Sequence, residues 1–235
     1  MIKINVLIAC EESQRNCIAF RERGHNAFSC DVQPCSGGHP EWHIHGDVME
    51  YINPKKKKGK KIISFKTADG QEHCIEGTWD LIIAHPPCTF LTNAGAVRLL
   101  NKDGTIKDQL RYRKGVEAAE FFMRIYNADC PRVVVENPVP LKIFNLPKYS
   151  QIVEPYFFSE PWKKRTCLWE RGVPLLEPTD IVEPQGLWVG STSANRDPEI
   201  YTKYKLTSHR DSKTRSKTFM GMANAMAEQW GALAQ

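Results

Sequence analysis

The stretch WDLIIAHPPC, residues 79–88, indicates an α/β fold. Its four consecutive apolar residues, 81–84, suit a parallel strand that is buried on both faces. Two prolines follow and end the strand, because proline has no N–H to give to a sheet. Cys88 is therefore expected just beyond the carboxyl end of a strand, where open α/β sheets bind their ligands.

A second stretch of the same kind is Val133-Val134-Val135, which is followed by Glu136-Asn137-Pro138. It should bring the Glu136 carboxylate to the same edge of the sheet as Cys88. A thiolate there is a candidate nucleophile. Burial would raise the pKa of Glu136 and allow it to donate a proton near pH 7. The simpler interpretations are a small buried thiol and a surface-loop glutamate.

The size and composition favour one α/β domain in a chain of 235 residues with 41% hydrophobic content. No apolar run approaches the roughly 20 residues of a membrane span, and residues 1–9 are too short for a signal peptide, so a cytoplasmic location is expected. The eight cysteines are scattered and suggest buried thiols rather than a disulfide framework. The net charge of +5 only weakly favours nucleic acid.

Expected strands at 3–10, 26–30, 81–84 and 133–135 alternate with expected helices at 13–23 and 109–127. This order predicts a parallel, doubly wound sheet. Within 53–78, Asp69-Gly70 separates two β-rich segments and predicts an inserted hairpin, with a surface role, that carries a lysine cluster. Further strands are expected at 156–158 and 166–169, an irregular region from 174, and a last helix at 222–233.

Acidic residues mark the same edge as a cofactor site. Asp31 ends the second strand, where α/β nucleotide folds bind ribose hydroxyls, and Asp47 follows the third and could receive an adenine amino group. The first turn, 9–14, has no glycine, which argues against a pyrophosphate. Glu11 and Glu12 in this turn would repel phosphate and suit a cationic ligand. These residues favour S-adenosylmethionine over a dinucleotide.

Taken together, these motifs resemble those of the DNA cytosine-5 methyltransferases, in particular the compact, phage-type members. The Pro-Cys motif of that family falls on Pro87-Cys88, and its Glu-Asn-Val motif on Glu136-Asn137-Pro138. The remaining matches are the Gly-Asp-Val element at 46–48, the Arg-x-Arg-like element at 163–165 and the C-terminal motif at 218–223. The usual Phe-x-Gly-x-Gly turn is replaced by 9–14.

The resemblance implies a Rossmann-like, doubly wound sheet of the class I S-adenosylmethionine-dependent methyltransferase type. It implies a catalytic core at 1–173, a small target-recognition region at 174–217 and a returning helix at 218–235. The reaction would move a methyl group to C5 of a flipped-out cytosine in double-stranded DNA through a Cys88 adduct. The protein is expected to act as a monomer, without a membrane partner.

The resemblance also assigns residues to roles. The catalytic residues would be Cys88, Glu136 and Arg165. The cofactor-binding residues would be Ala9, Cys10, Glu11, Glu12, Asp31, Val32, Asp47, Val48, Pro86 and Met222. The DNA-binding residues would be Lys55, Lys56, Lys57, Lys58, Lys163, Lys164, Arg196, Arg210, Lys213 and Arg215.

Three alternatives stay open. The same fold could transfer a modified group from an S-adenosylmethionine derivative. It could also be a non-catalytic DNA-binding protein, although the presence of both Cys88 and Glu136 argues against this. The third is a zinc-dependent module, for which the spacing of five residues is suggestive: Cys30, Cys35, His39, His43 and His45. No metal is expected under the methyltransferase interpretation.

Overall fold

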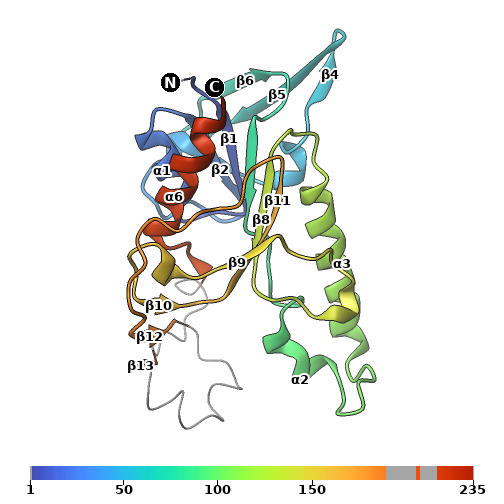
Figure 1. Ribbon diagram of the computed structural model, residues 1–235. Helices are drawn as coiled ribbons and strands as arrows, with labels where there is room; N and C mark the ends of the chain where they lie inside the picture. The colour runs from blue at the N-terminus through green and yellow to red at the C-terminus, as the bar shows by residue number, and fades with distance from the viewer. Residues whose placement is uncertain (1, 189–204, 207–215, 235) are drawn as a thin grey trace.

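The computed structural model describes residues 2–188, 205–206 and 216–234. A mixed seven-stranded sheet lies at the centre, with the strand order β3-β2-β1-β7-β8-β11-β9. Helices cover both of its faces (Figure 1), so the expected α/β class is confirmed. Within the described residues, no helix is long and apolar enough to cross a membrane. The strands of this sheet are β1 Asn5–Ala9, β2 Asn26–Asp31, β3 His43–His45, β7 Leu81–Ala84, β8 Val133–Asn137, β9 Gln151–Val153 and β11 Thr166–Arg171.

The first five strands of the sheet, from β3 to β8, are parallel. The chain adds β2 and β3 on one side of β1, and β7 and β8 on the other. The order therefore reverses between β1 and β7. In open α/β sheets the crevice at such a reversal, beyond the carboxyl ends of the strands, is where ligands bind.

The parallel arrangement predicted for the strands up to residue 135 is confirmed, and the sheet becomes mixed only at β11, which runs antiparallel to both β8 and β9. Counted along the chain within this sheet, the order is 3-2-1-4-5-7-6. It begins like the Rossmann order 3-2-1-4-5 and departs from it in the last two strands. Hydropathy cannot reveal this, because β11 is as apolar in its buried half as a parallel strand would be.

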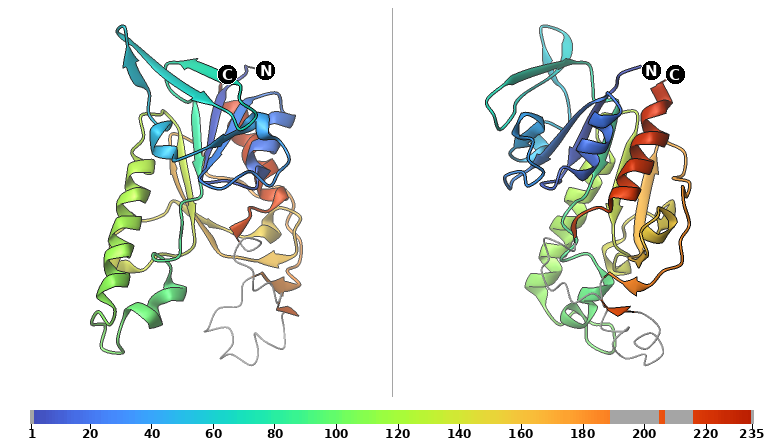
Figure 2. Two further views of the ribbon diagram at one scale, coloured as in Figure 1. Left: turned by 180° about the vertical axis from the view of Figure 1, so that it is seen from behind. Right: turned by 90° about the vertical axis from the view of Figure 1, so that its left-hand side faces the viewer.

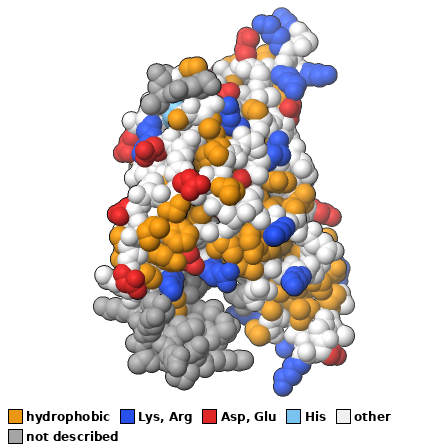
Figure 3. Space-filling model, in the orientation of Figure 1, with side chains coloured by type: hydrophobic (Ala, Val, Ile, Leu, Met, Phe, Trp, Pro, Cys, Tyr) orange, Lys and Arg blue, Asp and Glu red, His pale blue; other side chains and the backbone are white. Residues whose placement is uncertain are grey.

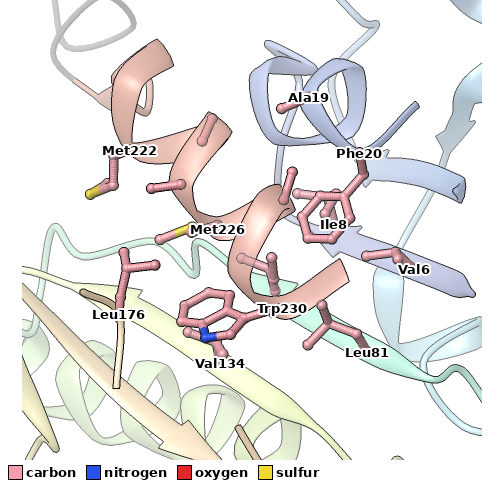
Figure 4. Close-up of a cluster of buried hydrophobic side chains, with 14 of the residues drawn as sticks. Val6, Ile8, Ala19, Phe20, Leu81, Val134, Leu176, Met222, Met226 and Trp230 are labelled. Atoms are coloured by element: carbon pink, nitrogen blue, oxygen red, sulfur yellow. The ribbon is translucent and has the colours of Figure 1, made fainter. Parts of the chain in front are cut away.

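Alternate residues of β1 enter different cores, because side chains along a strand point to opposite faces. Val6 and Ile8 pack under α1 (Arg15–Glu22) and α6 (Met220–Gly231), with Trp230 of α6 fully buried there (Figure 4). Leu7 and Ala9 belong to the opposite core, with residues of α3 (Gln109–Tyr126). The predicted helix at 109–127 is thus confirmed, and the last helix begins two residues before its predicted start.

The inserted hairpin is confirmed and gains a third strand. β4 (Lys55–Lys57), β5 (Lys60–Lys66) and β6 (Glu72–Glu76) form an antiparallel sheet of their own, called here the lysine sheet. Its tip lies at the end of the molecule that carries both termini, opposite α2 (Ala96–Leu99), in all views of Figures 1 and 2. The expected surface role covers only its outer face, because Ile63, Phe65 and Ile75 are buried in the core with Trp79.

The segment after β8 is less regular than expected. The predicted strand at 156–158 is a 3-10 turn, η5 (Pro155–Phe157), since Pro155 opens it. The predicted strand at 166–169 is confirmed as β11. A small sheet contains β10 (Trp162–Lys163), β12 (Gly186–Leu187) and β13 (Lys205–Leu206). The remaining short elements are η1 Pro40–Trp42, η2 Val48–Glu50, η3 Asn93–Gly95, η4 Lys142–Phe144 and η7 Ala232–Ala234.

Candidate functional site

Cys88 lies four residues beyond β7, in the turn that opens a long loop leading to α2 and α3. Pro86 is buried and Pro87 is exposed, and the Cys88 side chain is half-buried. The Cys88 carbonyl accepts hydrogen bonds from the backbone N–H of Leu91 (3.0 Å) and Thr92 (3.2 Å). The turn is therefore closed by its own backbone, and it presents a partly accessible thiol at the edge where ligands are expected.

Asn137 ties the Cys88 turn to the neighbouring strand. It ends β8, is almost fully buried, and its Nδ2 donates to the Pro86 carbonyl at 3.1 Å. The loops that follow β7 and β8 are joined again where Leu141 donates its N–H to the Leu91 carbonyl at 2.7 Å. These bonds fix the end of β7 relative to the end of β8, which carries Glu136.

Glu136 faces His85 rather than solvent. The His85 Nδ1 lies 3.2 Å from the Glu136 Oε2, and the two side chains are only 13% and 8% exposed. Burial raises the pKa of Glu136, but the adjacent His85 and the charge of Lys164 outweigh it and leave this pKa below its usual range. The expectation that burial makes Glu136 a proton donor near pH 7 is therefore wrong, because a cationic neighbour favours the carboxylate.

The other side of His85 leads to the first turn of the fold. Its Nε2 lies 3.0 Å from the Nδ2 of Asn16, in the first turn of α1. Glu11 accepts hydrogen bonds from the backbone N–H of Asn16 (2.8 Å) and of Cys17 (3.3 Å). The Glu11 carboxylate thus caps α1, an arrangement that satisfies N–H groups which a helix leaves unpaired. A chain of buried polar contacts consequently joins the turn after β1 to the end of β8.

The turn after β1 achieves its shape without glycine. Cys10 (φ 59°) and Gln14 (φ 60°) both adopt the left-handed conformation that non-glycine residues seldom use. The Glu12 carboxylate accepts from the Ser36 hydroxyl, and the Gln14 side chain binds the backbone of His39. Glu11 and Glu12, expected to contact a cationic ligand, thus direct their carboxylates into the fold.

Two other carboxylates gather at this edge. Asp31 ends β2 and Asp47 follows β3, and both lie close enough to Cys10 for their charges to act on it. Burial, with these two charges, raises the pKa of Cys10 to about 12. Asp31 also accepts from the Gln33 N–H (2.8 Å), and Asp47 from that of Met49 (2.9 Å). Beside them, Val32 is 70% exposed, which is unusual for an apolar residue of this size.

This donor set fits S-adenosylmethionine better than a phosphate-bearing cofactor. Carboxylates accept hydrogen bonds from ribose hydroxyls and attract a sulfonium cation, but they repel phosphate. An exposed valine offers an apolar surface to a base. The other expected contacts are less accessible: Ala9, Val48 and Pro86 are buried, and the Met222 side chain packs in the core beneath α6 (Figure 4).

The three cations of the 163–165 segment separate. Lys164 lies near the pair His85–Glu136, since its charge lowers the pKa of both groups, and its Nζ lies 5.7 Å from the centre of the Phe219 ring. Lys163 and Arg165 instead act on Glu154, and Arg165 is exposed. The cation that acts on His85 and Glu136 is thus Lys164, whereas Arg165, the cation expected at the reacting base, acts on Glu154.

Sequence reasoning missed a cationic surface beside Cys88. Arg111 of α3 donates to the Thr89 carbonyl at 2.8 Å, and its guanidinium lies 5.1 Å from the centre of the Phe90 ring, with Lys114 5.5 Å from the same ring. Nearby acids are already engaged: Asp103 binds Thr105, and Asp108 caps α3. The surface comprises Arg98, Lys102, Lys107, Arg111, Arg113 and Lys114. The sequence does show these cations, because they lie in the predicted loop after Cys88 and in the first turns of the predicted helix at 109–127.

The lysine sheet lies at the opposite end of the molecule from α2 (Figures 2 and 3). Lys60 pairs with Glu76 (3.4 Å) and Lys61 with Asp129 (2.7 Å). The four lysines at 55–58 are exposed and form no ion pair within the described part of the chain. Arg196, Arg210, Lys213 and Arg215 lie outside the described residues.

The zinc alternative gains no support in the described part of the chain, where no three His, Cys, Asp or Glu side chains are arranged around a metal site. Its candidate ligands have other partners. His43 binds Ser29 and the Gln33 carbonyl, and the His39 ring stacks on Trp42. Cys30 is buried in the core.

No protein-family model and no curated protein sequence matches this chain.

Proposed function

We propose that this protein is an S-adenosylmethionine-dependent DNA cytosine-5 methyltransferase with a class I, Rossmann-like core. One observation carries the proposal: the Cys88 turn is bonded through Asn137 to the strand that bears Glu136, beside the reversal of strand order. Covalent catalysis on a base needs a nucleophile and a group that binds the N–H of the base, and the two groups must be held at fixed positions relative to each other. The Cys88–Asn137–Glu136 connection supplies that relation.

Cytosine C5 is a poor nucleophile, and Cys88 and Glu136 would act by raising the electron density at C5. The Cys88 thiolate adds to C6, and the electron pair of the C5–C6 bond moves toward N3, which takes up a proton from water. The Glu136 carboxylate accepts the hydrogen bond of that N3–H, a charge-assisted contact. When the C5 proton later leaves to water, its bonding pair re-forms the C5–C6 double bond and expels Cys88 as the thiolate.

S-adenosylmethionine, when bound, would supply the electrophilic methyl group and leave as S-adenosylhomocysteine. C5 takes up the methyl group as the S–CH3 bond breaks, and N3 returns its proton to water. Asp31, Asp47 and the exposed Val32 would hold it, and both carboxylates lie close enough to Cys10 for their charges to act on it. The absence of glycine in the turn after β1 agrees with a cofactor that has no pyrophosphate.

We infer DNA as the substrate from the basic side chains near Cys88. A cytosine must leave the duplex to expose C6, and its flanking phosphates then need cations. Lys164 and the surface on α2 and α3 lie at the same end of the molecule as the Cys88 turn. Such contacts are salt-dependent because each releases counterions.

The proposal is tested by incubating the protein with S-adenosylmethionine and duplex DNA, followed by mass spectrometry of the nucleosides. We expect 5-methyl-2′-deoxycytidine from the wild type and none from the Cys88→Ala variant. A heavier modified nucleoside would indicate that a derivative group is transferred instead. DNA binding without any modified nucleoside would overturn the enzymatic proposal.

A second experiment tests the adduct itself. An oligonucleotide with 5-fluorocytosine at the target position has no C5 proton to lose, so Cys88 cannot be expelled after transfer. The wild type should become covalently attached, with the linkage mapped to Cys88 by peptide mass spectrometry. Attachment through a different cysteine would assign the nucleophile elsewhere.

A further inference from the structure

His85 lies between the two buried acidic groups of the site; it contacts Glu136 directly and Glu11 through Asn16. Its Nδ1 is 3.2 Å from the Glu136 Oε2, and its Nε2 is 3.0 Å from the Asn16 Nδ2. An imidazole can carry its proton on either nitrogen, so the partners decide which state exists. The partner at Nε2 is informative because its own orientation is fixed.

Glu11 fixes the orientation of the Asn16 amide. The Asn16 Nδ2 lies 3.2 Å from the Glu11 Oε1, which also accepts the Asn16 backbone N–H. Burial raises the pKa of Glu11, whereas His85 and the N–H groups of Asn16 and Cys17 lower it. As a carboxylate, Glu11 only accepts hydrogen bonds, and the amide nitrogen of Asn16 then points toward it. Rotating the amide would bring its oxygen against the carboxylate. The same Nδ2 is the atom that meets His85, with the Thr218 hydroxyl at 3.3 Å.

A donor at Asn16 excludes one form of His85. The neutral form with its proton on Nε2 would set an N–H against the amide N–H, and a bare Nδ1 against a carboxylate. Both other forms, the Nδ1–H tautomer and the imidazolium, carry a hydrogen on Nδ1 that faces Glu136. The imidazolium also sets its Nε2–H against the Asn16 amide, so this contact favours the neutral Nδ1–H tautomer. Burial opposes the imidazolium, whereas Glu136 and Glu11 favour it and Lys164 disfavours it, with the pKa of His85 raised overall.

We propose that His85 is a positioning residue for Glu136: Asn16 and Glu11 keep a hydrogen on Nδ1, and this N–H holds the Glu136 carboxylate in place for the target base. Oε2 is the fully buried oxygen of Glu136; it lies 3.2 Å from the His85 Nδ1, an ion-pair contact rather than a well-aligned hydrogen bond, and has no other polar partner within the described residues. This arrangement leaves the other oxygen for N3. The inference rests on the proposed function and adds a residue to it that the Pro-Cys and Glu-Asn motifs do not contain.

Two substitutions separate this role from simple packing. In His85→Asn the side-chain amide nitrogen can occupy the place of Nδ1, whereas in His85→Leu no donor remains. We expect His85→Leu to lower kcat by about 10²-fold, as a misplaced reacting group does, and His85→Asn to recover most of that loss. The affinity for S-adenosylmethionine, measured by calorimetry, should be the same in all three proteins.

The pH dependence of kcat separates a positioning role from simple packing, because a residue that only fills space would leave this dependence unchanged. The groups that face His85 are Glu136 of β8, Glu11 after β1 and Lys164 before β11. Without His85, burial acts on Glu136 opposed only by Lys164, so its pKa should rise. The acid limb of kcat should therefore move to higher pH in both variants, and further in His85→Leu, because asparagine can keep the hydrogen bond to Glu136 but not the positive charge. Equal activity of these two variants, or an unmoved limb in both, would overturn the proposal.

Nitrogen NMR of the wild type tests the hydrogen bond without any turnover. Long-range ¹H–¹⁵N correlations should show His85 with a protonated Nδ1 at every pH at which the protein is folded. A neutral His85 protonated on Nε2 would overturn the proposal even in an active enzyme. Absence of methyl transfer by the wild type, with Nδ1 protonated, would instead remove the proposed function and leave the hydrogen bond standing.

Discussion

The two ends of the central sheet are built in opposite ways. At the carboxyl ends of β1, β7 and β8, polar groups are buried and held by specific partners, as in the pair His85–Glu136. At the other end, the lysine sheet exposes its charges and buries only an apolar underside. The first construction fixes the positions of a few atoms, which chemistry requires. The lysine sheet instead carries several positive charges whose positions are not fixed by partners, and this is sufficient for contact with a polyanion.

The lysine sheet accumulates charge at some expense of stability. Its register sets Lys56 opposite Lys61 and Lys57 opposite Lys60. Like charges directly opposite each other destabilise an antiparallel pair. The underside compensates: the Phe65 ring lies 4.8 Å from that of Phe28 in an edge-to-face contact. The sheet is therefore an integral part of the fold that carries a cationic edge.

The largest expected effect is at the carboxyl end, where Cys88→Ala should abolish methyl transfer. The thiol makes its essential contribution only along the reaction path, so DNA affinity should stay the same. Cys74→Ala, which removes the exposed thiol of β6, is the matched control and should retain full activity. Methyl transfer by Cys88→Ala would remove this end of the sheet from the chemistry.

Glu136→Gln should lower turnover by about 10²–10⁴-fold, the range typical of a missing acid–base group. Because His85 holds the pKa of Glu136 below its usual range, wild-type activity should persist at high pH and fall only as the pH drops through that lowered value. Glutamine does not titrate, so the variant should lack this acid limb. Glu72→Gln, on the exposed edge of the lysine sheet, is the control.

Phe65→Ala tests whether the lysine sheet is structural. Phe65 is 6% exposed and packs on Phe28 and Trp79. Its truncation should lower the free energy of unfolding by about 3–5 kcal/mol, measured by urea denaturation. Lys56→Ala on the same sheet should stay within about 0.5 kcal/mol of wild type. An equally small loss for Phe65→Ala would make the lysine sheet a mere appendage.

The parts of the fold that the sequence predicted are those with a local cause. The run 81–84, the helix at 109–126 and the turn at Asp69-Gly70 each follow from periodicity or turn chemistry within a few residues. The antiparallel insertion of β11 depends on pairing with β8, more than 25 residues away along the chain. The direction of a strand leaves no pattern in hydropathy, so the sequence could not predict that β11 is antiparallel to β8.

The site divides in the same way. Cys88 and Glu136 are recognisable because each follows a buried strand. The role of His85 depends on Asn16, which is 69 residues away, and on Glu11, whose function as a helix cap only the folded turn reveals. A signal did exist: His85 is a polar residue closing an apolar run and directly preceding two prolines. His85 lowers the pKa of Glu136, and this reverses the rise that was expected from burial alone.

Asp31→Ala should weaken binding of S-adenosylmethionine by about 10- to 150-fold, the equivalent of roughly 1.5–3 kcal/mol for the removal of a charge-assisted hydrogen bond. Calorimetry measures this directly. Glu76→Ala, at the end of β6, where the side chain pairs with Lys60, changes the charge equally and should leave the affinity unchanged. Equal losses in both variants would mean that only overall charge matters.

The smallest effect is expected from the lysine sheet itself, and it should depend on DNA length. Two triple variants make the comparison: Lys55→Glu/Lys56→Glu/Lys57→Glu at one end, and Lys107→Glu/Arg113→Glu/Lys114→Glu at the other. All six residues are exposed. Reversal in the lysine sheet should not harm the fold, because it sets glutamates opposite Lys60 and Lys61. Affinity is measured by fluorescence anisotropy over a range of salt concentrations.

With a duplex of about 12 base pairs, roughly 40 Å long, only the variant near Cys88 should bind more weakly. Its slope of log affinity against log salt should become shallower by about 0.9 for each phosphate that the protein no longer neutralises. With a much longer duplex, the lysine-sheet variant should also bind more weakly and with a shallower slope, for all sequences alike, since lysine contacts phosphate as a point charge. This follows from geometry: a cationic edge at the far end of the molecule can meet only DNA that extends beyond the target site. Equal weakening on the short duplex would place both basic regions on one continuous DNA path, and unchanged affinity on either duplex would leave the lysines as solvated surface.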